Sequence, residues 1–521
     1  MKAWFCVRAT FLLLLLLITT GAFGQSKDAV ILNAQRMADN APETGRPGEI
    51  EIRDYTWRHL PKESLAVPGT PSWIPEHSII RDSSEAGTEK MLGLANAPSL
   101  TKTFAGNAVD NFDPPDPIIA AGPNHVITLV NYTISMYNKA GGRVFFRSFK
   151  NWFAGLAENQ GSFLFDPKVI YDQYDGHFII MCIAYHPGGN HSYIFFSVSK
   201  TPNPLGDWAF WTLDMQLNNL TRTSATADFP GIGYDQKAIY ITSNMLDNNN
   251  NFVYAKIRVL KKSQVYTYSK LFWHDFWNMT DVTGVKAMNV QPAQSFGTTA
   301  VEYLISTNAV GASKFTLWTI RNAATTATLG KRPILVSSYT LPPSAAQKGS
   351  TNTMNTGDTG VVNVVLRNGS LFTANAIAFN WGSGVVSAIR FFQINPVTAH
   401  VVQEITFGQD KLFYYYPAVM PDSRGNVTIV FNRSGLSEFA GIRFTGRKAA
   451  DPPGTLQTGA VLKNGLAHYN SPFQFPGALN PWGDYNGAAL DNVDDSIWIF
   501  SEYVKSPISW ATQVGRVKFT P

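Results

Sequence analysis

Aspartates that recur through the sequence are the residues best suited to chemistry. Each stands at the start of a short apolar stretch, and together they are Asp116, Asp166, Asp228, Asp358 and Asp484. A ring of carboxylates can bind a hard cation or a polyhydroxylated ligand, and a close pair can serve as acid and base. Aspartate also caps turns by accepting hydrogen bonds from nearby backbone N–H groups. Both roles stay open, and the proline after Asp116 and after Asp166 favours the cap.

The stretches around these aspartates repeat one pattern. Residues 228–242 and 484–503 each contain an acidic start, a small apolar strand, a polar turn and a second apolar strand. Similar units start near residues 116, 166, 291, 358 and 416. Each supplies one or two more strands within the roughly 50 to 68 residues before the next unit, which is the size of a propeller blade.

The sequence therefore predicts an all-β protein, a β-propeller of seven blades with four antiparallel strands each. A parallel α/β fold needs helical segments between its strands, and the sequence has almost none. A β-sandwich would not explain the repeat. The composition agrees, because aromatic residues reach 13% while charged residues stay at 15%, a profile typical of β-rich chains with many turns.

Closure of the ring needs a strand from elsewhere in the chain. The last unit has only three clear strands, and an open ring would leave two exposed sheet edges. Residues 100–105 form a β-type stretch just before the first unit, so we expect them to supply the missing outer strand. Residues 96–521 would then form the propeller, preceded by an irregular extension over residues 25–95 with a short helix over 29–38.

The first 24 residues have the features of a secretory signal peptide. Lys2 and Arg8 give a basic start, residues 11–18 are apolar, and Ala22 and Gly24 are small residues suited to cleavage. We expect a secreted or periplasmic protein with no transmembrane anchor in the mature chain, since no later apolar run approaches 18 residues. Cys182 would then be the single remaining cysteine, a small buried hydrophobe.

The charge pattern argues against nucleic acid as a partner. The net charge is +5, and it falls to +3 without Lys2 and Arg8. The basic residues are scattered rather than gathered in a stripe.

Propeller geometry predicts where the candidate residues meet. Because the first two strands of a blade are antiparallel, the start of the first and the end of the second lie at the same end of the ring. The ends of the second strands add Asn131, Asn244, Asn308, Asn380, Arg433 and Glu502. The ligand-binding candidates at this channel mouth are Asp116, Asp166, Asp228, Asp358, Asp484, Asn244, Asn380, Arg433 and Glu502. His186 and His191 lie in a loop at the same end, and without a third ligand they favour a solvated loop over a metal site.

Three functions are consistent with such a mouth. The first is an exported propeller that binds a glycan, peptide or envelope partner through the Asp- and Asn-lined mouth, for which a divalent cation such as calcium is the matching cofactor. The alternative is a glycoside hydrolase or lyase that uses carboxylates at the same mouth. An enzyme of that kind needs two carboxylates roughly 5–10 Å apart flanking room for a sugar. A third is a purely structural surface protein with no ligand.

Two motifs carry a family resemblance. Residues 111–126 (NFDPPDPIIAAGPNHV) and 482–491 (WGDYNGAALD) resemble a group of secreted bacterial seven-bladed propeller proteins of unassigned function. The resemblance covers about residues 100–521 and implies a propeller fold and export, with no catalytic residue. The pattern is more distantly similar to sialidase-type propellers, but their Asp-box (Ser-x-Asp-x-Gly-x-Thr-Trp) is absent and their arginine triad cannot be placed.

Overall fold

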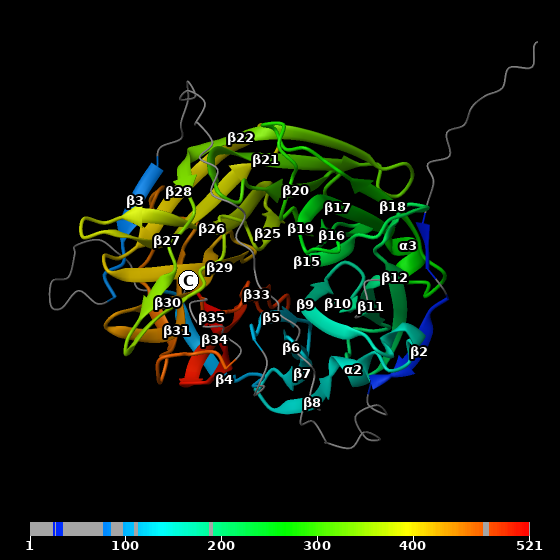
Figure 1. Ribbon diagram of the computed structural model, residues 1–521, viewed down its shortest axis with the longest axis horizontal. Helices are drawn as coiled ribbons and strands as arrows, with labels where there is room; N and C mark the ends of the chain where they lie inside the picture. The colour runs from blue at the N-terminus through cyan, green and yellow to red at the C-terminus, as the bar shows by residue number, and fades with distance from the viewer. Residues whose placement is uncertain are drawn as a thin grey trace, which may run out of the picture.

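The structure is a computed structural model that describes residues 24–26, 28–34, 77–84, 97–108, 113–186, 191–472 and 479–519. Nearly all regular structure in these residues is β-strand, and the strands surround a central axis (Figure 1). The all-β propeller expected from the repeat is confirmed. The predicted signal peptide and most of the extension over residues 25–95 lie outside the described residues.

The described strands pair into antiparallel groups of four, which we number as blades 1 to 7 along the chain. Blade 1 contains β5 (Ile118–Ala121), β6 (His125–Val130), β7 (Thr133–Asn138) and β8 (Arg143–Ser148). Blade 2 contains β9 (Phe163–Asp172), β10 (His177–Tyr185), β11 (Ser192–Ser199) and β12 (Asp207–Asp214). Blade 3 contains β15 (Thr226–Tyr234), β16 (Ala238–Leu246), β17 (Phe252–Lys261) and β18 (Phe272–Trp277). Blade 4 contains β19 (Gln291–Phe296), β20 (Glu302–Ser306), β21 (Gly311–Arg321) and β22 (Thr328–Thr340).

The remaining blades follow the same order. Blade 5 contains β25 (Val364–Arg367), β26 (Ser370–Asn380), β27 (Val385–Asn395) and β28 (His400–Gly408). Blade 6 contains β29 (Leu412–Pro421), β30 (Val427–Gly435), β31 (Glu438–Arg447) and β32 (Ala460–Lys463). Blade 7 contains β33 (Gly487–Leu490), β34 (Ile497–Ser506), β35 (Ser509–Lys518) and β4 (Ser99–Ala105). Short elements in the loops are α2 (Phe149–Trp152), η1 (Ala157–Asn159), β13 (Leu217–Asn218), β14 (Thr221–Arg222), α3 (Lys262–Val265), β23 (Ala345–Gln347) and β24 (Ser350–Met354).

The first strand of each blade lies at the axis. Neighbouring first strands contact one another around the ring, from β5 through β9, β15, β19, β25, β29 and β33 back to β5. In blades 3 to 5 they approach so closely that β19 hydrogen-bonds in parallel with both β15 and β25. The axial channel is therefore narrow on that side.

The hydrophobic core is divided among the interfaces between blades. Middle strands such as β10 and β30 are buried along almost their whole length, because each blade packs between two neighbours and both of its faces are covered. The buried apolar residues form clusters that follow this division. One example joins Ile179 and Trp211 of blade 2 to Ile239 and Trp273 of blade 3. No blade can bury its faces without both of its neighbours.

The predicted closing strand is confirmed. β4 pairs antiparallel with β35, with Phe104 opposite Val514 and Thr103 opposite Gly515. The ring of Phe104 lies 4.9 Å from Tyr137 of blade 1 and 6.0 Å from Trp498 of blade 7, measured between ring centroids. An N-terminal strand thus completes the last blade and ties it to the first.

Three more N-terminal segments extend the outer edges of blades. β1 (Gly24–Gln25) pairs with β18, β2 (Val30–Asn33) pairs with β12, and β3 (His77–Arg81) runs parallel to β28. The expected helix over residues 29–38 is wrong at Val30–Asn33. Val30 and Leu32 pack against the core between blades 1 and 2, so the edge of β12 outweighs local helix propensity. Residues 35–38 lie outside the described part.

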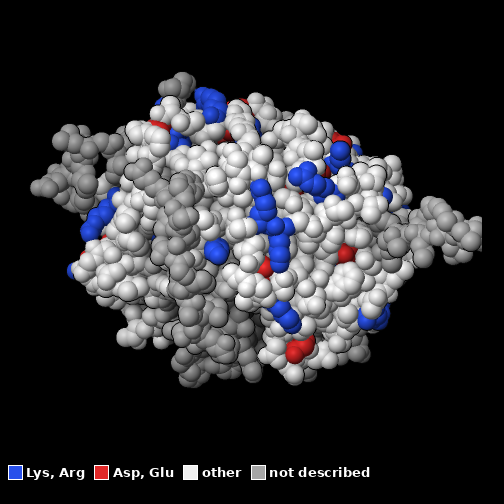
Figure 2. Space-filling view, turned by 90° about the horizontal axis from the view of Figure 1, so that it is seen from above, with Lys and Arg blue, Asp and Glu red and all other residues white. Residues whose placement is uncertain are grey.

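The scattered basic residues and the buried cysteine expected from the sequence are both seen in the structure. On the side shown in Figure 2, Lys and Arg are scattered over a mainly uncharged surface. Cys182 is fully buried in β10. Among the described residues, none of the helices has the length and apolar character needed to cross a membrane.

The closure yields a prediction about stability. Deleting residues 97–105 removes β4 and exposes the edge of β35, so we expect the melting temperature to fall by roughly ten degrees or more. Leu100→Ala is the matched control, because Leu100 is 38% exposed within the same strand and its loss should shift the melting temperature by about one or two degrees. Unchanged stability after the deletion would rule out the closing role.

Candidate functional site

A left-handed backbone residue marks the approach to the first strand in several blades. Asp116, Asp166, Phe229, Asn289 and Tyr416 have φ between 48° and 52°. In all but Asn289 the next residue is proline. Non-glycine residues rarely adopt this conformation, so the surrounding structure must stabilise it. The propeller therefore repeats a backbone conformation at this end of the axis.

This conformation corrects one sequence expectation. The five aspartates are not at equivalent positions, because Asp228 precedes the left-handed Phe229 and Asp358 follows the left-handed Gly357, whose φ is 73°. Among these five blades the side chain at the left-handed position varies, whereas the conformation is shared. Asn289 and Tyr416 therefore belong to the same set as Asp116 and Asp166, although their residue types gave no sequence signal.

Side chains from neighbouring blades hold these residues in place. Asn131 donates through Nδ2 to Asp116 Oδ2 at 2.7 Å and accepts the backbone N–H of Asp166 at 2.7 Å. Asp166 Oδ2 accepts the N–H of Phe229 at 3.0 Å, and Asp116 Oδ1 accepts the N–H of Asp484 at 3.0 Å. These contacts join blades 7, 1, 2 and 3. Asp116 and Asp166 thus have the capping role.

The same arrangement continues in blades 3 to 5. Asn244 accepts the N–H of Asn289 at 3.0 Å and donates to its side-chain oxygen at 2.6 Å. Asn289 in turn donates to Asp358 Oδ2 at 2.7 Å, and Asp358 Oδ1 accepts the N–H of Gly360 at 2.6 Å. Asn244 and Asp358 therefore help to link blades 3 to 5 through hydrogen bonds near the axis.

The aspartates converge electrostatically as the sequence predicted. Burial raises the pKa of Asp166 well above its usual range, and the charges of Asp116, Asp228 and Asp484 add to the shift. Burial, with the charges of Asp116, Asp228 and Asp358, likewise raises the pKa of Asp484 well above normal. Burial raises the pKa of Asp228 to about 6, assisted by Asp116, and the pKa of Asp358 to about 6. The mouth therefore concentrates negative charge that the fold does not fully balance.

Lys168 is the cation nearest this charge, and the sequence reasoning missed it. Its ammonium lies over the ring of Tyr485, 2.9 Å from the ring centroid. Burial lowers the pKa of Lys168 to about 7, against the opposing effect of the charges of Asp166, Asp116 and Asp484. Strand alternation offered no signal for Lys168, because the left-handed Asp166 and a register shift interrupt the strand just before it.

A hollow opens beside the cluster at this end of the axis. It holds about 360 Å³ of empty space, part of it open to solvent, and its lining includes Asp358, Asp484, Asn289, Tyr416 and Phe229. Asp484 and Asp358 keep some solvent exposure although protein atoms crowd around their carboxyl groups. We call this hollow the acidic hollow. It combines two carboxyl groups, one carboxamide and two aromatic rings.

Glu502 lies behind the cluster and is fully buried. Neither of its carboxyl oxygens has a hydrogen-bond partner among the described residues. Burial raises the pKa of Glu502 well above its usual range, and the charge of Asp116 adds to the shift. Its carboxyl group packs against Gly483, where a Cβ would come within 3.0 Å of Oε1. Burial therefore disfavours the charged form of Glu502, which lies close to the mouth but not on its surface.

Two predicted ligand-binding residues have structural contacts instead. Asn380 is exposed at the end of β26 and caps its own turn, accepting the N–H of Gly382 at 2.9 Å. Arg433 is buried, and its guanidinium contacts Asp82 at 3.2 Å and Glu438 at 2.9 Å. Of the nine predicted ligand-binding residues only Asp358 and Asp484 line the acidic hollow, and Asn380 and Arg433 do not. Arg433 instead anchors the segment that follows β3.

The two histidines of the predicted loop lie at the edges of a gap in the described residues. The rings of His186 and His191 lie 6.4 Å apart, and residues 187–190 between them are outside the described part. No group of three or more His, Cys, Asp or Glu in the described part has an arrangement that could hold a metal ion.

Comparison with known proteins gives low similarity throughout. No protein-family model matches the chain, and no curated protein matches it in sequence. A Dyadobacter fermentans protein of unknown function has 9% identity and a TM-score of 0.39, over 81% of this chain and 100% of that one. The extracellular domains of Drosophila Semaphorin 1b have 8% identity and a TM-score of 0.34, over 81% of this chain and 87% of that one. Trypanosoma rangeli sialidase has 8% identity and a TM-score of 0.35, over 78% of this chain and 59% of that one. Such low TM-scores assign neither a ligand nor a reaction to this chain.

Arg433 yields a prediction about stability alone. Arg433→Met leaves Asp82 buried without its cation, so we expect a loss of about 3–5 kcal/mol in the free energy of unfolding, measured by chemical denaturation. Arg424→Met is the control, because Arg424 is 49% exposed and its pair with Asp422 should contribute about 0–1 kcal/mol. Equal effects from the two variants would contradict the anchoring role of Arg433.

Glu502 yields a prediction about pH. Because the folded protein holds this carboxyl group protonated while the unfolded chain ionises it, wild-type stability should fall as pH rises above the unfolded pKa of about 4.5. Glu502→Gln removes this ionisation and keeps the shape. We expect its melting temperature to exceed that of the wild type by several degrees at pH 8 and to approach it near pH 4. A difference that is the same at both pH values would exclude a raised pKa.

Proposed function

We propose that the protein is an exported binding propeller whose acidic hollow takes a positively charged amino group carried by a glycan, peptide or envelope component. The observation that supports this most is that Asp358 and Asp484 line one hollow and have raised pKa values. Carboxyl groups that resist ionisation because of burial and neighbouring negative charge gain most from a cation placed between them. The basic and apolar start of the sequence supports export to the periplasm or beyond.

The aromatic residues support an organic cation as the ligand. Phe229 and Tyr416 line the same hollow, and an ammonium group is attracted to the face of an aromatic ring. The chain already holds one ammonium group in this way, since that of Lys168 lies over the ring of Tyr485 and interacts with nearby carboxylates. A ligand amine beside Asp358 and Asp484 would meet the same combination of ring and carboxylate.

The contacts of the other carboxylates favour binding over catalysis. Asp116 and Asp166 accept hydrogen bonds from backbone N–H groups of neighbouring blades. A group in that role is poorly suited to change its charge during each catalytic cycle. These are the turn-capping carboxylates expected of a binding or scaffold protein.

Hydrolysis of a glycoside is the second candidate function. It is favoured by one observation, the two carboxyl groups of raised pKa that line a single hollow. A glycosidase requires one protonated and one ionised carboxyl group on either side of the scissile bond. Release of nitrophenol from a panel of aryl glycosides by the wild type, lost in Asp484→Asn, would establish this activity in place of simple binding.

The proposed function predicts charge-dependent binding. Calorimetry would compare glucosamine oligosaccharides and lysine-containing peptides with their N-acetylated counterparts, so that the two sources of the amine are separated. We expect the amino forms of at least one source to bind and the acetylated forms to bind at least tenfold more weakly. Asp484→Asn should weaken binding about tenfold, which corresponds to about 1.4 kcal/mol. Asp247→Asn, in an exposed turn between β16 and β17, is the control.

Binding should also depend on pH. Affinity for the lysine peptide, whose amine stays charged, should fall as the pH drops from 7 to 5, because Asp358 becomes protonated with a pKa of about 6. Equal binding of amino and acetylated forms, or no effect of Asp484→Asn, would exclude the acidic hollow as an amine site.

A further inference from the structure

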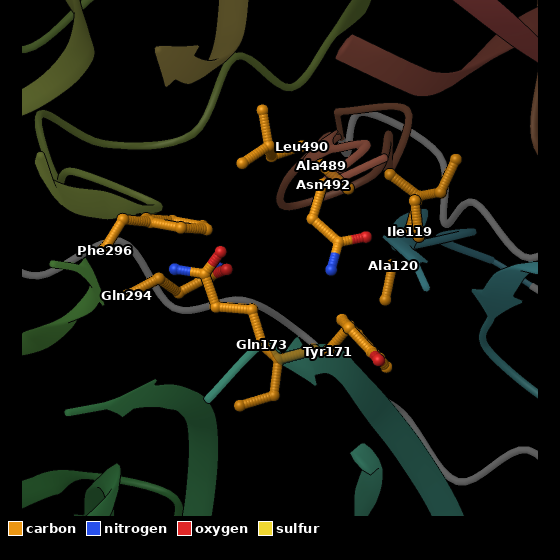
Figure 3. A pocket seen from close by; sticks show the side chains of 11 residues that line it. Ile119, Ala120, Tyr171, Gln173, Gln294, Phe296, Ala489, Leu490 and Asn492 are labelled. Atoms are coloured by element: carbon orange, nitrogen blue, oxygen red, sulfur yellow. The ribbon is translucent and has the colours of Figure 1, made fainter. Parts of the chain in front are cut away.

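A second hollow lies where the first strands of the blades end, opposite the acidic hollow. Figure 3 shows three carboxamide side chains around it, Gln173, Gln294 and Asn492. They come from three blades, since Gln173 follows β9, Gln294 lies in β19 and Asn492 follows β33. We call this the carboxamide hollow. It is a shallow hollow, with about 300 Å³ of empty space that includes open solvent.

The fold makes no visible use of these three carboxamides. No described residue forms a hydrogen bond with the side chain of any of the three. Some other carboxamides of the protein are fully engaged. Gln347, for example, donates to the backbone oxygens of Asn352 and Tyr469 and accepts the N–H of Tyr469. The carboxamide hollow therefore has unused donors and acceptors, which is the property of a binding site rather than of a core.

The lining selects an uncharged ligand. None of the described residues that line the hollow is Asp, Glu, Lys, Arg or His. Arg367 lies against the ring of Phe296, 5.1 Å from its centroid, and is 3.9 Å from Asp495. A charged ligand would lose its hydration here without gaining a partner of opposite charge. A neutral ligand with many hydrogen-bonding groups meets no such penalty.

The remaining lining is apolar and includes aromatic rings. Tyr171 and Phe296 stand on the walls between the carboxamides, and Ile119 and Leu490 complete the surface (Figure 3). A sugar ring combines hydroxyl groups, each both a donor and an acceptor, with an apolar C–H face. Carboxamides match the hydroxyls because each offers two N–H donors and one acceptor oxygen. The aromatic rings match the C–H face.

We propose that the carboxamide hollow is a second binding site that takes one neutral sugar ring, held by Gln173, Gln294 and Asn492 and packed against Phe296 or Tyr171. The site does not depend on the proposed amine site, because it lies at the other end of the axis and uses no carboxylate. Its ligand is free of the charge that the acidic hollow requires.

The test is calorimetric titration of the full chain with methyl β-glucoside, methyl β-galactoside, methyl β-xyloside and N-acetylglucosamine. We expect at least one to bind, and the double variant Gln173→Ala/Asn492→Ala to weaken that binding at least tenfold. Gln236→Ala is the matched control, an exposed glutamine in the turn between β15 and β16 at the same end of the ring. Asp484→Asn should leave this binding unchanged, which separates the proposal from the acidic hollow.

Two outcomes would overturn the proposal. One is the absence of binding by all four saccharides at millimolar concentration. The other is binding that the double variant leaves intact. Should the double variant fail to fold, the single variant Asn492→Ala decides the question, because Asn492 is exposed in the turn after β33 and its loss should not unfold the blade.

Discussion

Closure of the ring is the constraint on which the rest of the structure depends. Every blade has two apolar faces and relies on both neighbours to cover them, so an incomplete ring would expose a full face as well as a sheet edge. β4 prevents this by joining blade 7 from the other end of the chain, and Phe104 packs between aromatic residues of blades 7 and 1. Closure also brings distant segments together at the axis. The hydrogen bond between the N–H of Asp484 and Asp116 joins residues that are 368 positions apart in the sequence.

The acidic cluster follows from this convergence. Left-handed residues before or within the early part of the first strands place backbone N–H groups against side chains of neighbouring blades, and buried N–H groups need acceptors. Asn131, Asp166 and Asn244 supply them, which explains why carboxylates and carboxamides gather at this end. The structural need does not account for Asp484, whose carboxyl group faces the acidic hollow and caps no neighbouring blade in the described part. A crowded carboxyl group without a structural role is the stronger argument for a ligand.

The sequence predicted the architecture well and the individual roles poorly. The repeat, the closing strand and the convergence of the aspartates all follow from strand periodicity and from antiparallel pairing, which depend on the local pattern. The contacts of Arg433 were not predicted because a strand end does not reveal which way its side chain turns, and the partner Asp82 belongs to a segment with no visible repeat. Lys168 and Asn289 were missed for a related reason. Their positions depend on backbone conformation and on packing between neighbouring blades. The residue type alone reveals neither.

The two ends of the axis differ because the fold makes unequal demands on them. At the acidic end the left-handed residues require acceptors, so most polar side chains there are already hydrogen-bonded. At the other end the first strands turn directly into the second, as at Asp235, whose side chain serves its own hairpin by accepting the N–H groups of Lys237 and Ala238. The turns satisfy themselves, so Gln173, Gln294 and Asn492 are not needed to join blades. The carboxamide hollow therefore keeps hydrogen-bonding capacity that the hairpin turns do not use, although the aspartates made the acidic end the more visible one in the sequence.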